Sequence, residues 1–129
     1  MKEILKNWLL FAKSDLDAAN RLFNSPRPTQ WTYLLTLWHC HQVIEKTLKM
    51  IIIKKNKELL KIHDLTKLSK ISEINLSKEQ KQLLEDLNEF YLRSRYPDLF
   101  YKPLPQPNKD FTKNYLEKTK KLFLWLKKQ

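Results

Sequence analysis

Glycine is entirely missing from this chain of 129 residues, and cysteine occurs only once. Phosphate-binding loops of the Walker type, dinucleotide-binding fingerprints and the nucleophile elbow of hydrolases all need glycine at fixed positions, so the sequence excludes these sites. The single cysteine, Cys40, allows neither an internal disulfide nor a zinc site built from several cysteines. These absences exclude much enzyme chemistry, and we expect no cofactor.

Long hydrophobic runs are missing as well. The longest uninterrupted runs span only a few residues, such as Met50-Ile51-Ile52-Ile53, whereas a membrane-spanning helix needs about 20 apolar residues. We therefore expect no membrane association. Because no signal peptide is visible at the start and the lone cysteine requires no oxidising compartment, a cytoplasmic location is expected.

Positive charge is present in excess. The chain has 25 Lys and Arg against 14 Asp and Glu, a formal net charge of +11, and a basic surface attracts phosphate groups. Only Arg21, Arg27, Arg93 and Arg95 are arginines, whereas specific phosphate recognition favours clustered arginine over scattered lysine. Charge alone therefore leaves nucleic-acid binding and a merely soluble surface equally open.

The length and the composition, 42% hydrophobic and 30% charged, predict one domain over residues 1–129. Apolar residues recur at spacings of three and four along four long segments, the pattern of amphipathic helices. Thr29 and Ser77 are expected to cap the second and third helices, and Asp110 or Thr112 to open the last. We predict an all-α fold, an up-and-down four-helix bundle with a short additional helix. The expected long helices cover residues 2–23, 29–55, 77–95 and 110–126, and the short helix covers residues 63–68.

Polar residues interrupt the buried face expected for the second helix. His41, Glu45 and Lys49 lie four residues apart, so they share one stripe of the helix. This stripe fits either a binding site or a salt-bridged flank. A metal held by His41 and Glu45 would need a further ligand such as His39 or His63. Because His39 and His41 lie on different faces of a helix and no closing ligand set is visible, we expect no metal site.

Four groups of residues, in a fixed order along the chain, carry a family resemblance. They are Trp8, Ala12, Asp15-Leu16 and Ala18-Ala19; Cys40-His41-Gln42 and Glu45-Lys46; His63-Asp64-Leu65; and Arg95-Tyr96-Pro97-Asp98. Together they resemble the HEPN domain, named for its occurrence in higher eukaryotes and prokaryotes and its association with nucleotide-binding proteins. The resemblance covers nearly the whole chain.

The resemblance implies a helical bundle that commonly dimerises and is often made beside a minimal nucleotidyltransferase, as a two-component or toxin-antitoxin pair. Many HEPN proteins are metal-independent endoribonucleases that use an Arg followed, after four to six residues, by a His. No His follows any of the four arginines at that spacing. The nuclease activity is therefore not implied, and the variant Arg95-Tyr96-Pro97-Asp98 is one that we associate with binding members.

The candidate ligand-binding residues are Arg93, Arg95, Tyr96, Asp98, Glu45 and Lys49. Guanidinium groups pair bidentately with phosphates, and a tyrosine beside two arginines can stack a base. Alternatively, the arginines pair with Asp98, Glu45 or Glu89 and only fix the helix end. The candidate catalytic residues are Arg95, His41 and His63, with one histidine replacing the missing one as acid or base.

Three functions stay open from the sequence. The first is a nucleotide- or RNA-binding partner of a minimal nucleotidyltransferase, the second an endoribonuclease with an atypical active site, and the third a structural helical adaptor whose lysines only keep it soluble. We also expect a homodimer, from the resemblance and from a surplus of large apolar residues. These residues are Trp31, Tyr33, Tyr101, Phe111 and Phe123.

Overall fold

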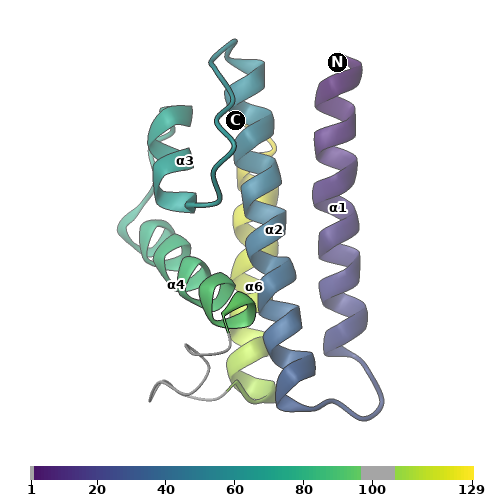
Figure 1. Ribbon diagram of the computed structural model, residues 1–129. Helices are drawn as coiled ribbons and strands as arrows, with labels where there is room; N and C mark the ends of the chain where they lie inside the picture. The colour runs from purple at the N-terminus through teal and green to yellow at the C-terminus, as the bar shows by residue number, and fades with distance from the viewer. Residues whose placement is uncertain (1, 97–106) are drawn as a thin grey trace.

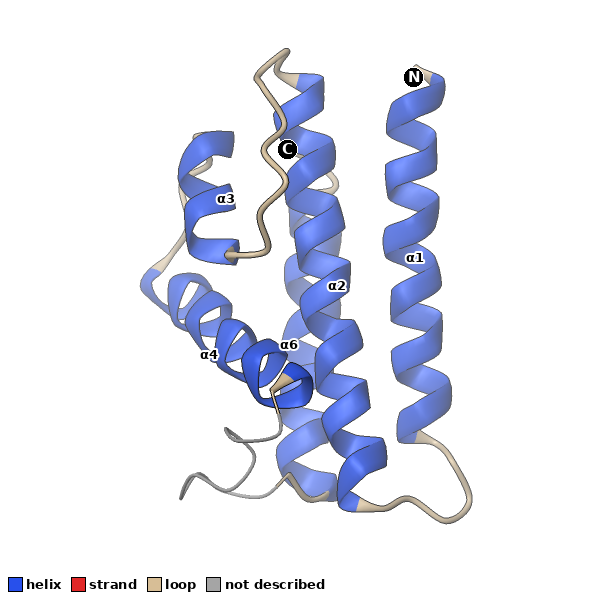
Figure 2. Cartoon of the chain, in the orientation of Figure 1, coloured by secondary structure: helices blue, strands red, loops and turns tan. Residues whose placement is uncertain are grey.

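The computed structural model describes residues 2–96 and 107–129, and every regular element in this part of the chain is an α-helix (Figure 1, Figure 2). The predicted all-α class is therefore confirmed. None of these helices is long and apolar enough to cross a membrane. Asp98 and Tyr101 lie outside the described residues. The helices are α1 (Glu3–Phe23), α2 (Gln30–Lys54), α3 (Leu65–Ser72), α4 (Lys78–Arg95) and α6 (Lys109–Leu126).

Side-chain caps fix where the helices begin. Thr29 and Ser77 cap the starts of α2 and α4, as predicted, and in both cases the cap is a capping box. The Asp64 carboxylate accepts hydrogen bonds from the Thr66 and Lys67 amides of α3, which extends to Ser72 and is longer than predicted. The predicted start of the last helix was wrong, because Asn108 rather than Asp110 or Thr112 is the cap of α6 and accepts from the Phe111 amide.

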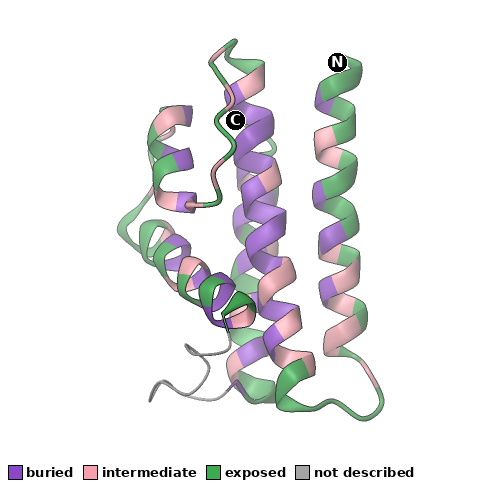
Figure 3. Ribbon diagram, viewed as in Figure 1, coloured by how far each residue is buried: buried purple, intermediate pink, exposed green. Residues whose placement is uncertain are grey.

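Helix α2 lies at the centre of the fold and packs against each of the other four helices. It is buried along most of its length (Figure 3), while α1 runs antiparallel to it on one side (Figure 1). Helix α4 crosses obliquely in the same view. The up-and-down four-helix arrangement therefore stays a prediction, and what is established is a central helix surrounded by the others.

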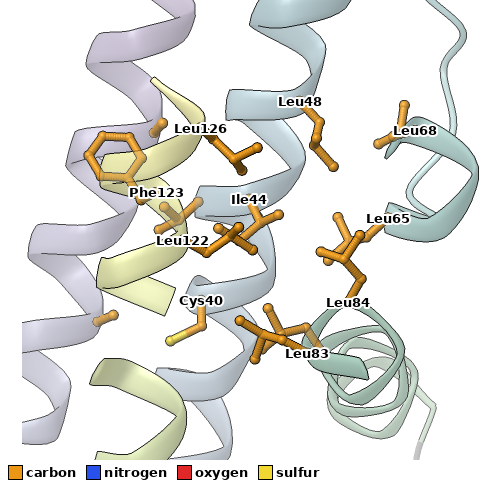
Figure 4. Close-up of a cluster of buried hydrophobic side chains, with 14 of the residues drawn as sticks. Cys40, Ile44, Leu48, Leu65, Leu68, Leu83, Leu84, Leu122, Phe123 and Leu126 are labelled. Carbon is orange, nitrogen blue, oxygen red and sulfur yellow. The ribbon is translucent and has the colours of Figure 1, made fainter. Parts of the chain in front are cut away.

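The hydrophobic core lies around α2 and includes buried side chains from all five helices, with α1 contributing Ala12 and Ala19 (Figure 4). Ile44 and Leu48 of α2 are fully buried there, and burying a side chain of this size contributes about 1.5–3 kcal/mol to stability. Cys40 is also fully buried, so the lone cysteine is a core residue. Phe123, predicted to belong to an apolar surplus at the surface, lies in this core at 3% exposure, which corrects that assignment.

Two turns adopt the left-handed conformation without glycine. Asn56, after α2, has φ 56°, and Glu73, the C-cap of α3, has φ 54°. Asparagine tolerates this region because its short side chain can bond locally, whereas a glutamate is disfavoured there. The turn at Asn56 starts the segment that leads the chain to His63.

Candidate functional site

Five of the predicted site residues, His41, Glu45, Lys49, His63 and Arg95, are linked by contacts where the middle of α2, the segment before α3 and the end of α4 come together. A pocket of about 190 Å³ lies at this junction. Four of its five lining residues are polar or aromatic side chains from the start of α3 and from α4. The lining residues are His63, Asp64, Asn88, Tyr91 and Leu92.

Glu45 and His63 form a carboxylate–histidine pair beside this pocket. His63 Nδ1 lies 2.9 Å from Glu45 Oε1, and Glu45 is 4% exposed while the His63 side chain is 52% exposed. A carboxylate only accepts, so Nδ1 carries the proton, and in the neutral ring Nε2 is left as the acceptor. Within the described part of the chain, His63 Nε2 has no protein partner. The arrangement thus presents an oriented imidazole nitrogen at a half-exposed position.

Lys49 completes the predicted stripe on α2. Its Nζ atom donates to Glu45 Oε2 at 3.1 Å, and Lys49 is only 7% exposed. Both Glu45 oxygens are therefore occupied, one by Lys49 and one by His63. The stripe is a buried ion pair that supports His63, so neither Glu45 nor Lys49 presents its charge on the surface.

His41, by contrast, is a structural residue. It is fully buried, its Nε2 donates to the backbone carbonyl of His63 at 2.9 Å, and Gln42 Nε2 lies 3.3 Å from its Nδ1. Burial lowers the pKa of His41 to about 4, against the raising effect of nearby Glu45. His41 is therefore neutral at physiological pH and holds the backbone that carries His63.

Tyr91 of α4 joins the histidines to Arg95. Its ring stacks on His41 with centroids 4.4 Å apart and on His63 with centroids 5.4 Å apart. Arg95, one turn further along α4, donates to the Tyr91 hydroxyl, and its guanidinium carbon lies 5.6 Å from the ring centroid. The exposed Arg95 head is thus held on the same aromatic ring that His63 contacts.

Asn88 anchors the segment that carries His63. Its Nδ2 donates to Asp64 Oδ1 at 3.1 Å, and its Oδ1 accepts from the Leu65 amide at 3.0 Å. These two bonds tie the start of α3 to the side of α4. The turn before α3 is thereby positioned against the pocket.

The other predicted residues differ in their accessibility. Arg93 is 5% exposed, whereas Arg95 and Tyr96 are exposed, Tyr96 at 47%. Arg95 forms no ion pair with Glu45 or Glu89, both of which are described. Of the two arginines, Arg95 is the one whose head is available to a ligand.

Sequence reasoning missed Tyr91 and Asn88. Tyr91 could have been found from its spacing, because it lies four residues before Arg95 on the same helix. No local signal points to Asn88, since its partners lie 23 and 24 residues earlier. Among residues 2–96 and 107–129, no group of three or more His, Cys, Asp or Glu side chains could hold a metal ion.

A second carboxylate–histidine contact links α1 and α2. Asp15, 8% exposed, lies 2.9 Å from His39 Nδ1 through one oxygen and accepts from Lys46 Nζ through the other. Burial raises the pKa of Asp15, but the bonds from His39 and Lys46 outweigh this effect and hold the pKa below its usual value. Asp15, His39 and Lys46 do not line the pocket beside His63. Their contacts hold α1 against α2.

The family model described as "HEPN domain" matches residues 5–129. No curated protein and no solved structure matches the chain.

Proposed function

Because the chain belongs to the HEPN domain family, we propose that it is a nucleotide- or RNA-binding protein that serves a minimal nucleotidyltransferase as its partner. The observation that supports this proposal most is the exposed Arg95 guanidinium, held against Tyr91 beside the half-exposed His63. An arginine held in this way loses less conformational freedom when it binds a phosphate than a freely moving lysine does. The ligand would contact this end of α4.

The chemistry of this end of α4 suits a nucleotide. One Arg95 nitrogen is used by Tyr91, and the other donors of its guanidinium can pair with phosphate oxygens. Exposed Tyr96 offers a ring on which a base can stack. Arg93, Glu45 and Lys49 are buried and would act by supporting these groups, and Asp98 lies outside the described residues.

RNA binding can be tested with two arginine variants that remove the same charge, one inside the proposed site and one outside it. We expect Arg95→Ala to weaken the gel shift of a mixed cellular RNA about tenfold, since one charge-assisted phosphate contact is lost. Arg27→Ala removes the same charge from the exposed turn between α1 and α2 and should leave the shift nearly unchanged. Equal weakening by both variants would contradict a site at Arg95.

A second function, metal-independent RNA cleavage, is favoured by the Glu45–His63 pair. His63 Nε2 would take the proton from a ribose 2′-hydroxyl, whose oxygen attacks the phosphorus, and the bond from phosphorus to the 5′-oxygen breaks as the imidazolium returns that proton to the leaving oxygen. Glu45 would stabilise the imidazolium and Arg95 the charge that develops on the phosphate. His41 does not fit this role, because it is fully buried and its Nε2 is held by the His63 carbonyl.

Cleavage in EDTA distinguishes this function from binding alone. Pure protein should degrade the RNA, and His63→Ala and Arg95→Ala should each abolish the products while leaving the circular dichroism spectrum unchanged. If the unmodified protein leaves the RNA intact, the cleavage function is lost and the binding function stands on the gel shift. If cleavage persists in both variants, it comes from a contaminant.

We further propose that the protein forms a homodimer. Four of the large hydrophobic side chains that are about half exposed lie on α1 and at the start of α2: Ile4, Leu10, Phe11 and Trp31. Exposed apolar groups of this kind are typical of association surfaces. Sedimentation at micromolar concentration should show a dimer, and Phe11→Glu should shift it toward the monomer. A monomer at every concentration would exclude the homodimer.

A further inference from the structure

A second pocket lies on the opposite half of α4, between that helix and α6. Its volume is about 530 Å³, within the range of small-molecule sites. It is lined by the first part of α4 and the last part of α6. The lining residues are Ser77, Glu79, Gln80, Gln82, Leu83, Asp86, Lys118, Lys121, Leu122 and Trp125.

The pocket exists because α4 and α6 contact each other only over a short length. They meet at an aromatic cluster in which Phe90 packs edge-on against Phe111 and Tyr115, with centroids 5.6 and 4.9 Å apart. Towards the start of α4 and the end of α6 the pocket opens between them, and Figure 1 shows α4 running obliquely to the other long helices. The floor is apolar, since Leu83 and Leu122 are buried there.

The two rims of the pocket carry different groups. On the α6 rim, Lys118 Nζ is held 5.3 Å from the Tyr115 ring centroid, and Lys121 forms no ion pair with any described residue. On the α4 rim, Asp86 is already hydrogen-bonded, by the Tyr115 hydroxyl at 2.8 Å and by Gln82 at 3.0 Å. Glu79, also on the α4 rim, is an exposed carboxylate with no hydrogen bond or ion pair to any described residue. A ligand's anionic group would therefore bind at the α6 rim, where Lys118 and Lys121 are the positive charges of the lining.

Trp125 supplies a planar, half-buried wall next to these lysines. An indole face stacks on planar rings, and lysine pairs with anionic groups as a point charge. On the opposite rim, Gln80 Oε1 accepts from the Ser77 amide and Gln82 Nε2 donates to Asp86. The other polar atom of each amide, Gln80 Nε2 and Gln82 Oε1, can hydrogen-bond the polar edge of such a ring.

From these observations we propose that the α4–α6 pocket binds a small molecule made of a planar aromatic ring and an anionic group. The ring stacks on Trp125 over the Leu83–Leu122 floor, and the anion pairs with Lys118 and Lys121. Phosphates and carboxylates both meet this description, and a mononucleotide is one such molecule. The site is separate from the Arg95 site proposed above, which lies at the other end of α4.

Calorimetric titration of the full chain tests the proposal. The probes are the four nucleoside 5′-monophosphates and indole-3-acetate, with adenosine lacking the anion and ribose 5-phosphate lacking the ring. We expect saturable binding of at least one probe that has both parts, and much weaker binding of the two incomplete probes. Binding of the nucleotides alone identifies a phosphate ligand, and binding of indole-3-acetate alone a carboxylate ligand. No saturable binding of any complete probe overturns the proposal.

Variants locate the binding. Lys118→Gln with Lys121→Gln should weaken it about tenfold, whereas Lys113→Gln with Lys128→Gln, which removes two charges from exposed positions outside the pocket, should not. Trp125→Leu should also weaken binding about tenfold or more, because stacking on the indole is lost. Arg95→Ala should leave it unchanged, which separates this site from the proposed RNA site. Binding that the Lys118/Lys121 pair does not affect overturns the proposal even if Trp125→Leu fails to fold.

Discussion

Two carboxylates of this chain, Asp15 and Glu45, are each buried with one histidine held through its Nδ1 atom. The two pairs differ in what the histidine can reach. The His39 side chain is 23% exposed, whereas His63 is 52% exposed and lines a pocket next to Tyr91. The same pairing thus fastens two helices in one place and presents an oriented imidazole in the other.

Glu45 and Lys49 should show the energetics of a buried ion pair. Glu45→Gln leaves the Lys49 charge buried without its partner, and we expect it to lower the free energy of unfolding by about 3 kcal/mol. Adding Lys49→Met should restore much of this loss, because the second charge is then also removed. Urea denaturation at pH 7 measures both effects. A double variant no more stable than Glu45→Gln would show that the loss has another cause.

His41 should make stability depend on pH. Its pKa is about 4 in the folded chain against 6.5 for an ordinary histidine, so the unfolded chain binds more protons between these values. The contribution is therefore fully present above pH 6.5 and falls as the pH drops towards 4, by about 3 kcal/mol in all.

Chemical denaturation between pH 8 and pH 4 checks this expectation. His41→Gln keeps a side-chain amide donor for the His63 carbonyl but cannot titrate. It should be less stable at pH 8 and should lose less stability on acidification than the unmodified protein. Equally steep curves for the two proteins would assign the acid sensitivity to other groups.

At the scale of the elements, α3 depends on Asn88. Asn88→Ala removes the bonds to the Leu65 amide and to Asp64, and we expect it to lower the free energy of unfolding by about 1–2 kcal/mol. Hydrogen exchange should accelerate in the segment before α3 and in α3, but not in α1.

Asn114→Ala, at an exposed position of α6, is the matched control and should change neither quantity. If Asn88→Ala accelerates exchange evenly over all helices, Asn88 stabilises the whole fold and has no particular role in holding His63.

The helices were predictable because their signals are local. Thr29 and Ser77 are side-chain caps that can be recognised from the residues that follow them, and both act as predicted. The start of α6 was missed because Asn108 competes with two other plausible caps within four residues. The oblique placement of α4 depends on which side chains meet across long sequence separations, which no periodicity reports.

The candidate site was predictable to a similar extent. The spacing of His41, Glu45 and Lys49 correctly predicted one stripe, and the Glu45–Lys49 ion pair is the flank proposed as one alternative. That Glu45 also meets His63 depends on how the chain returns to α2 after residue 54. Asn88 was missed because its partners lie on another element, and the contacts of Tyr91 with the two histidines likewise join separate elements, although its spacing to Arg95 is local.

For the whole molecule, the net charge of +11 means that the proposed RNA binding should weaken as salt rises. The slope of log K against log salt reports how many phosphates are contacted, and loss of one contact lowers it by about 0.7–0.9. We expect Arg95→Ala to reduce the slope by this amount and Arg27→Ala to leave it unchanged. Gel shifts at four salt concentrations measure it. Equal slopes for the unmodified protein, Arg95→Ala and Arg27→Ala would show that no single arginine makes a specific phosphate contact. That result would favour the structural adaptor, whose lysines only keep it soluble.

Because Cys40 is buried in the core, the reactivity of its thiol reports how often the core around α2 opens. Its thiol is fully buried, and burial raises its pKa to about 12, so thiol reagents, which attack the thiolate, should not react while the core is closed. Cys40 is also the chain's only cysteine, so every labelled molecule counts one opening event of the core around α2. The rate of labelling therefore gives the rate or the free energy of that opening directly in native buffer, in a cell extract, or with a bound partner, where denaturants cannot be used.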